Sequence, residues 1–265
     1  GFFVWEGRAR EPLVDLGLFR SAAFTWGVVL AGIGGLAMIG VLFTMPQYFQ
    51  GVNGVDAMAS GVRLLPLIGG LVLGAVPADR VAGKLGAKMT VALGFVALAA
   101  GLVIGGRTST VSEVAFVAGW MALVGLGMGL TLATSAACAL SALPEERSGV
   151  GSAVMQAAQK VGGPFGSAIL GSVLSAGYVG HLDLAGLPPA TASAVRSGIF
   201  GGLAVGRQVG EAGLLDSVRA AFVNGMDAAL MVSAGIAIAG LVLTLAFLPG
   251  SRAVRSRKRE AVLAA

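Results

Sequence analysis

Charged residues are spaced so unevenly along this chain of 265 residues that most of it divides into long charge-free stretches. These stretches contain 35 residues between Arg20 and Asp56, 18 between Lys88 and Arg107, 31 between Glu113 and Glu145, 22 between Lys160 and Asp183, and 24 between Asp227 and Arg252. A helix needs about 20 apolar residues to cross the hydrocarbon core of a bilayer, so five stretches are long enough to span it. Hydrophobic residues make up 56% of the chain and charged residues 12%, which excludes a soluble globular domain and a disordered segment.

A sixth span is expected between Asp56 and Asp79, where Arg63 is the one charged residue. The predicted spans lie near residues 24–49, 58–78, 89–106, 114–141, 149–177 and 222–248. A transmembrane β-barrel would instead alternate apolar and polar residues in segments of about 10, and residues 91–104 and 231–247 show no alternation. The predicted fold class is therefore an all-α integral membrane protein with six transmembrane helices. The six-helix bundle is expected at 21–250, after a cytoplasmic loop at 1–20 and before a basic cytoplasmic tail at 251–265.

The first residues indicate that the chain continues a longer polypeptide. Residue 1 is Gly, and residues 1–5 form an apolar segment that resembles the end of an earlier span. The segment lacks the basic region and the small-residue cleavage site of a signal peptide. We therefore expect this chain to be the C-terminal part of a larger protein.

The distribution of Lys and Arg predicts the orientation. With six spans both ends of the chain lie on one side, which carries 12 basic residues: Arg8, Arg10, Arg20, Arg80, Lys84, Lys88, Arg147, Arg252, Arg255, Arg257, Lys258 and Arg259. The other side carries four: Arg107, Arg196, Arg207 and Arg219. Basic residues in short loops mark the cytoplasmic face, so both ends are predicted to be cytoplasmic. A basic tail after a span meets anionic lipid, so the net charge of +5 does not indicate nucleic acid.

The sequence lacks the residue patterns that are typical of catalytic and metal-binding sites. The single Cys138 has no partner for an internal disulfide and is expected to act as a small hydrophobe. The single His181 lies beyond the fifth span. No cluster of His, Cys, Asp and Glu has metal-ligand spacing, and neither a Ser-His-Asp set nor a phosphate-binding loop occurs. The sequence therefore predicts no enzyme, no metal and no organic cofactor.

Glycine makes up 43 of the 265 residues and often recurs at a spacing of four. The pairs are Gly70/Gly74, Gly101/Gly105, Gly125/Gly129 and Gly162/Gly166. Small residues at this spacing let helix backbones approach closely in lipid, which predicts a compact bundle. Pro46, Pro66 and Pro164 lie inside predicted spans, where each removes a helical hydrogen bond and favours a kink.

Polar residues and Met recur on particular faces of four spans and mark a candidate pathway for a small molecule. Three- and four-residue spacings put them on shared faces, and Met and aromatic side chains suit a pocket that accepts varied apolar shapes. Ordinary helix packing is the alternative for most of them. The candidate pathway residues are Met38, Thr44, Met45, Gln47, Tyr48, Arg63, Thr131, Ser135, Gln156, Gln159 and Lys160.

Several charged groups lie at or inside the predicted spans, and each could have more than one role. Lys160, within the fifth span, either faces protein or water in a functional site or extends to the cytoplasmic interface. Asp56 is expected to cap a helix rather than pair with Arg63. Asp227 is expected to be a solvated carboxylate at the outer edge of the last span, and a proton-linked role is the alternative. The outer loop at 178–221 is expected to contain a helix that starts at 188–191, covers 192–200 and ends at Gly201 and Gly202, and a second helix at 214–223 that leads into the last span. The loop would act as a lid over the outer vestibule or form a passive surface hairpin.

An ordered set of segments resembles the fourteen-helix drug/proton antiporters of the major facilitator superfamily. These segments are residues 12–20, 47–50, 60–66, 125–130, 144–149 and 162–171. The predicted cytoplasmic turn with Asp79, Arg80, Gly83 and Lys84 resembles the gate motif between two helices of that superfamily, with a Gly-to-Asp spacing one residue longer.

The resemblance implies one six-helix half-bundle of a major facilitator fold, built as two inverted three-helix repeats. The first, second, fourth and fifth helices would face a central cavity, and the third and sixth would face lipid. It implies proton-coupled efflux of lipophilic drugs or other small molecules across the plasma (inner) membrane. The expected partners are the substrate, protons, membrane lipid and a missing N-terminal half that carries the coupling acids. A carrier of the same fold for a sugar or organic acid, or a scaffold that transports nothing, are the alternatives.

Overall fold

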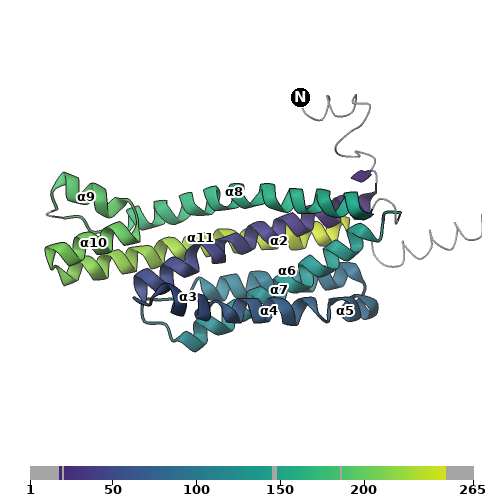
Figure 1. The fold of residues 1–265 in the computed structure, drawn as a ribbon, viewed down its shortest axis with the longest axis horizontal. Helices are drawn as coiled ribbons and strands as arrows, with labels where there is room; N and C mark the ends of the chain where they lie inside the picture. Colours follow the sequence, from purple (N-terminus) through teal and green to yellow (C-terminus); the bar gives the residue numbers. More distant parts are fainter. Residues whose placement is uncertain (1–17, 20, 145–147, 186, 249–265) are drawn as a thin grey trace, which may run out of the picture.

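The computed structural model describes residues 18–19, 21–144, 148–185 and 187–248. The long elements of these residues are all helices (Figure 1). They are α2 (Ala22–Gln47), η2 (Tyr48–Val52), α3 (Ala57–Arg63), α4 (Leu65–Ala75), α5 (Ala78–Leu85), α6 (Ala87–Gly105), α7 (Val114–Leu140), α8 (Ser148–Gly180), α9 (Pro189–Arg196), α10 (Ile199–Val209) and α11 (Ala212–Phe247). The predicted all-α fold is confirmed in this part of the chain. The predicted loop at 1–17 and tail at 251–265 lie outside the described residues.

The long helices run lengthwise beside one another and form an elongated bundle (Figure 1). Helix α7 packs against α2, α4 and α6, while α11 packs against α2, α6 and α8. One end of the bundle carries α5, and the opposite end carries α3, α9 and α10 (Figure 1). We call these the α5 end and the cap end. Near the α5 end Trp26 of α2 stacks on Phe247 of α11, with ring centroids 4.4 Å apart.

Five of the described segments are long and apolar enough to cross a membrane. They are Ala22–Val52, Ala57–Ala75, Ala87–Gly105, Val114–Leu140 and Ala212–Phe247. Each coincides with a predicted span. The remaining prediction, 149–177, folds as the continuous helix α8, which runs beside α2 and α11 but is not among these five. It carries Gln156, Gln159 and Lys160, which lower its hydropathy.

The second span is broken between α3 and α4, at Leu64. Pro66 is near the start of α4, where its missing N–H costs no hydrogen bond within that helix. Leu64, at the break, keeps right-handed helical angles, with φ −84° and ψ −12°. Before α3, the Asp56 carboxylate accepts a hydrogen bond from the Ala59 N–H at 2.7 Å. This confirms the predicted cap.

Helix α2 widens into the π-helix η2 directly after Pro46. Proline has no backbone N–H to donate, and an insertion of this kind is one way a helix absorbs such a lost bond. The widened turn places Tyr48 and Phe49 in the core, with 0% and 2% of their surface exposed.

Two glycine pairs interlock α4 and α7. A Cβ added to Gly70 or Gly74 would strike the backbone of α7 at Ala122 or Leu126. A Cβ added to Gly125 or Gly129 would strike the backbone of α4. The backbones touch directly, as the four-residue spacing predicts.

Of the other two glycine pairs, one packs closely against a neighbouring helix and one does so only in part. Gly101 and Gly105 of α6 lie against Val124 and Trp120 of α7, so this pair also serves close packing. Gly166 meets the side chains of Leu36 and Ile39 of α2. The space beside Gly162 is open, so the packing prediction fails there.

The segment predicted as an outer loop is largely helical. Helix α9 ends at Arg196, Gly201 and Gly202 lie inside α10, and α11 already begins at Ala212. The prediction of one helix ended by the two glycines is therefore wrong. The chain instead turns at Gly198, whose φ of 140° is one that side-chain-bearing residues rarely adopt. The Tyr178 hydroxyl donates to the carbonyls of Val195 at 2.9 Å and Gly198 at 3.2 Å, which fastens this turn to α8.

Candidate functional site

Four predicted pathway residues of the first span lie inside the bundle. Met38, Thr44, Met45 and Tyr48 are all buried, with no more than 8% of their surface exposed. The Thr44 hydroxyl donates to the Gly40 carbonyl at 2.7 Å. Gln47 is half-buried, and its amide donates to the Phe43 carbonyl at 2.8 Å. In the described part of the chain these side chains therefore pack in the core or donate hydrogen bonds to backbone carbonyls.

The predicted polar stripe of α7 is also enclosed. Thr131 lies where α2, α6 and α7 meet, because Cβ atoms added to Gly34 or Gly94 would contact its side chain. Ser135 is fully buried, and its backbone carbonyl faces Gly27 of α2. The hydroxyls of Thr131, Thr134 and Ser135 have no hydrogen-bond partner among the described residues.

The predicted polar face of α8 lies on the surface of the described bundle. Gln156 and Lys160 are exposed and Gln159 is half-buried. Exposed apolar side chains continue the same helix, including Phe165 with 65% of its surface accessible and Ile169 with 48%. The structure thus separates the predicted pathway residues into an enclosed set and this open set on α8.

The predicted gate turn folds as the short helix α5. Asp79, Arg80, Gly83 and Lys84 are all exposed, and α5 packs against α6 and α7. The acid lies in the first turn and the lysine in the last turn, which is the favourable arrangement for a helix dipole. The prediction of a tight turn is wrong because this charge order stabilises a helix.

A group of polar side chains gathers at the cap end, which we call the Tyr48 cluster. It comprises Tyr48, Arg63, Ser109 and Asp227. The Tyr48 hydroxyl donates to the Ser109 carbonyl at 2.8 Å, and Ser109 and Asp227 line the same pocket. The Arg63 guanidinium carbon lies 5.7 Å from the centre of the Phe49 ring, as in a cation–π contact. Three separate segments and α11 therefore meet here.

A pocket of about 340 Å³ opens beside this cluster. The turn after α6 and one face of α11 line it: Arg107, Thr108, Ser109, Thr110, Ala220, Val223, Asn224 and Asp227. Its volume is within the range of small-molecule sites. Hydroxyl, amide, guanidinium and carboxylate groups share its walls with the apolar side chains of Ala220 and Val223, so its lining is mixed.

Asp227 differs from the sequence prediction of a solvated carboxylate. Its side chain is only half-exposed at most, and Oδ1 is buried without a hydrogen-bond partner among the described residues. The sequence signal was present, since Asp227 directly precedes 24 uncharged residues. What the sequence did not reveal is that Asp227 and the turn at 107–110 line the same pocket.

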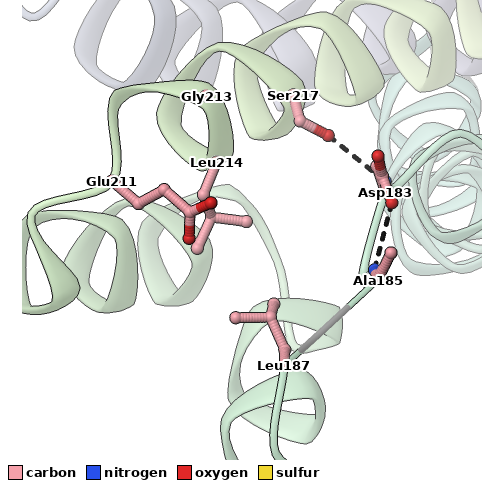
Figure 2. A pocket seen from close by; sticks show the side chains of 7 residues that line it. All are labelled: Asp183, Ala185, Leu187, Glu211, Gly213, Leu214 and Ser217. Carbon is pink, nitrogen blue, oxygen red and sulfur yellow. Dashed lines mark hydrogen bonds between the residues drawn. The ribbon is translucent and has the colours of Figure 1, made fainter.

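A second, smaller pocket of about 200 Å³ lies between the start of α11 and the segment before α9. Figure 2 shows Asp183 and Ser217 joined on one side, with Glu211 apart from them. The Ser217 hydroxyl accepts from the Asp183 N–H at 3.2 Å, and the Asp183 carboxylate accepts from the Ala185 N–H at 3.0 Å. These bonds hold the loop. No group of three His, Cys, Asp or Glu residues able to bind a metal occurs in the part of the chain that the structure describes.

Comparisons with known proteins point in one direction. The profile of the Major Facilitator Superfamily matches residues 5–167. The chain is 31% identical over 259 residues to the tetracenomycin C resistance and export protein of Streptomyces glaucescens, covering 92% of this chain and 48% of that protein. It is 29% identical over 246 residues to the multidrug efflux pump LfrA of Mycolicibacterium smegmatis, covering 89% and 49%. It is 26% identical over 175 residues to the multidrug transporter protein MdtP of Bacillus subtilis, covering 66% and 32%. The chain thus spans about half the length, or less, of these curated relatives.

Proposed function

Because this chain belongs to the Major Facilitator Superfamily, we propose that it forms part of a proton-coupled exporter of lipophilic drugs or other small molecules. The observation that carries the proposal is the match over 92% of the chain to a protein named for resistance and export. The other relatives named above are a multidrug efflux pump and a multidrug transporter. They support a transporter rather than an enzyme at the level of the family.

We propose that the described helices form a six-span half-bundle. Five are apolar enough to span by themselves. The 33 residues of α8 would be about 50 Å long at 1.5 Å per residue, which is more than the roughly 30 Å of the hydrocarbon core. Because α8 runs beside α2 and α11, it would cross with them. Pairing of the spans as two inverted three-helix repeats remains part of this proposal.

The missing half of the polypeptide would cover the faces that this half leaves open. Only 22% of the second span is buried, and its α4 exposes Leu73 at 68% and Val72 at 50%. The open face of α8 combines apolar side chains with Gln156 and Lys160. An apolar wall interrupted by a few polar groups suits a lipophilic substrate, so we place the substrate pathway along this side of α8.

The orientation proposed from the Lys and Arg distribution puts the α5 end in the cytoplasm and the cap end outside. The helix α5 would then be the cytoplasmic gate segment, with Asp79, Arg80, Gly83 and Lys84 at its surface. The membrane would be the plasma membrane. The energy would come from the proton gradient and not from a bound cofactor.

Expression of the complete polypeptide in cells that lack their own efflux pumps tests the function. Energised cells are expected to exclude a lipophilic dye, because the carrier would exchange it for protons, and a protonophore is expected to abolish the exclusion. Dye fluorescence inside the cells measures this directly. Equal dye accumulation with and without the protein, at confirmed expression, contradicts the proposal.

Lys160→Met in the complete carrier is expected to impair export of at least some substrates while expression stays near that of the unsubstituted protein. An ammonium inside a span has to face water or a partner because burying it alone is costly, at least ~2.5 kcal/mol on insertion scales. Lys160→Arg should be milder, since it keeps the charge but changes its shape. Export rates for a panel of dyes measure the effect.

Lys88→Met is the matched control for this substitution. Lys88 lies in the first turn of α6, at the predicted cytoplasmic interface, and is not part of the proposed pathway. If Lys160→Met exports every tested compound at the unsubstituted rate, Lys160 only extends to the interface and has no role in the pathway.

A further inference from the structure

Asp227 lies at the inner wall of the pocket at the cap end, between the turn after α6 and the face of α11. One carboxylate oxygen, Oδ1, is buried and unpartnered within the described part of the chain. The amide of Asn224, one turn earlier, donates to the Ala220 carbonyl at 2.9 Å and so is engaged by its own helix. The carboxyl group is therefore a polar group whose natural partner is something other than a neighbouring side chain.

The charged and titratable groups near Asp227 leave it without a direct counter-ion. Arg107 shares the pocket but is exposed, and Tyr48 of η2 donates to Ser109 instead. Arg63 lies over the Phe49 ring, and its Nη1 is, like Oδ1 of Asp227, buried without a hydrogen-bond partner in the part of the chain that the structure describes. The described residues contain no ion pair between the two side chains.

The helices packed on α11 add no further charge at this pocket. Helix α2 has no charged residue, and the one charge of α6 is Lys88, at the opposite end of that helix. Lys160 and Tyr178 of α8 and Arg207 of α10 are not among the pocket residues. An ionised carboxylate held here without a partner is disfavoured, and such groups take up a proton or another cation.

The pocket supplies a route between this carboxyl group and water. Thr108, Ser109 and Thr110 line it, and an open pocket of this size with polar groups in its walls admits water. Helix α11, at 36 residues, is about 54 Å long, longer than the roughly 30 Å of the hydrocarbon core. With the span at 222–248, Asp227 lies less than two turns inside its outer boundary.

We propose that Asp227 is a proton-binding group that exchanges its proton with the outer aqueous side through this pocket. In this step the Asp227 carboxylate takes up a proton delivered by pocket water and becomes a neutral carboxyl group. It later releases the same proton back to pocket water. The inference rests on the proposed orientation and on proton-coupled export. It adds a proton site within this half of the carrier.

Infrared spectroscopy on the purified complete carrier in liposomes tests protonation directly. The spectrum at low pH minus that at high pH should contain a carboxylic-acid C=O band that Asp227→Asn removes. Asp216→Asn is the matched control, because Asp216 is on the same helix with its side chain 80% exposed, and it should leave that band in place. Asp227→Glu keeps a carboxyl group and should retain the band at a shifted frequency, which also covers the case in which Asp227→Asn does not fold.

Transport in the same liposomes provides the second measurement. Asp227→Asn should lose dye accumulation driven by a pH gradient and keep dye exchange in the absence of a gradient. If the unsubstituted carrier moves no dye but the band depends on Asp227, the proposed export is wrong and the proton site stands. Identical bands in Asp227→Asn, Asp227→Glu and the unsubstituted carrier overturn the proton site. The proton site is also overturned if Asp227→Asn leaves the band unchanged and only weakens the binding of cationic dyes. Asp227 would then be a contact for the substrate.

Discussion

Gly125→Val is expected to destabilise the folded protein by about 3 kcal/mol, at the upper end of the cost of overpacking. The first added carbon would strike the Leu67 carbonyl and lie 2.8 Å from the Leu71 amide nitrogen of α4. Both are backbone atoms, which cannot rotate away as a side chain can. The helices α4 and α7 would have to separate. The loss of monodisperse protein on heating in detergent, followed by size-exclusion chromatography, measures the effect.

Gly119→Val is the control for this substitution. It lies on the same helix, is exposed, and has nothing within 4 Å of an added Cβ. Both substitutions make the same change in helix propensity, so their difference isolates the contact with α4. Equal thermal stability of the two variants would contradict the interlocked arrangement of α4 and α7.

This chain by itself is expected to move no dye in response to a proton gradient, although the complete carrier does. Alternating access in carriers of this kind needs two bundles that move about a site between them. The proposed pathway would lack its opposing wall in this chain, because Gln156, Lys160 and Phe165 of α8 are exposed on the described bundle. Dye fluorescence in liposomes containing only this chain, under an imposed pH gradient, measures transport.

Liposomes with the complete carrier at the same protein-to-lipid ratio are the positive control. Protein-free liposomes give the leak rate. Gradient-driven movement by this chain well above that leak would mean that it contains a whole pathway. The open faces of α4 and α8 would then serve a different purpose, such as pairing two copies.

The sequence was sufficient for features with a local cause. Charge-free runs located four of the five segments that are apolar enough to span a membrane. The Asp56 cap followed from a side chain three residues before its donor, and the four-residue spacing of Gly70, Gly74, Gly125 and Gly129 indicated close helix contact. These features depend on chain geometry within one or two turns. The residue patterns that predict them therefore lie within a single helix.

The features that the sequence did not reveal depend on contacts between distant segments. Thr131 is enclosed because α2 and α6 both carry a glycine opposite it. The buried Oδ1 of Asp227 was not foreseen, because the carboxyl group lies in a pocket that α11 forms with the distant turn after α6. The glycines Gly201 and Gly202 remain helical because Tyr178 and Val218 pack over the second of them. In each case tertiary packing overrides a local preference.

The backbone contact between α4 and α7 determines how this bundle is able to change shape. Side chains that interdigitate permit small slips through rotamer changes, but carbonyls pressed against Cα atoms have no such freedom. We therefore expect α4 and α7 to move together as one rigid helix pair. Bending has to concentrate at its borders, and the break at Leu64 and the widened turn after Pro46 are places where the hydrogen-bond ladder is already interrupted. Any change in the shape of this bundle would bend the chain at these two places and leave the contact between α4 and α7 unchanged.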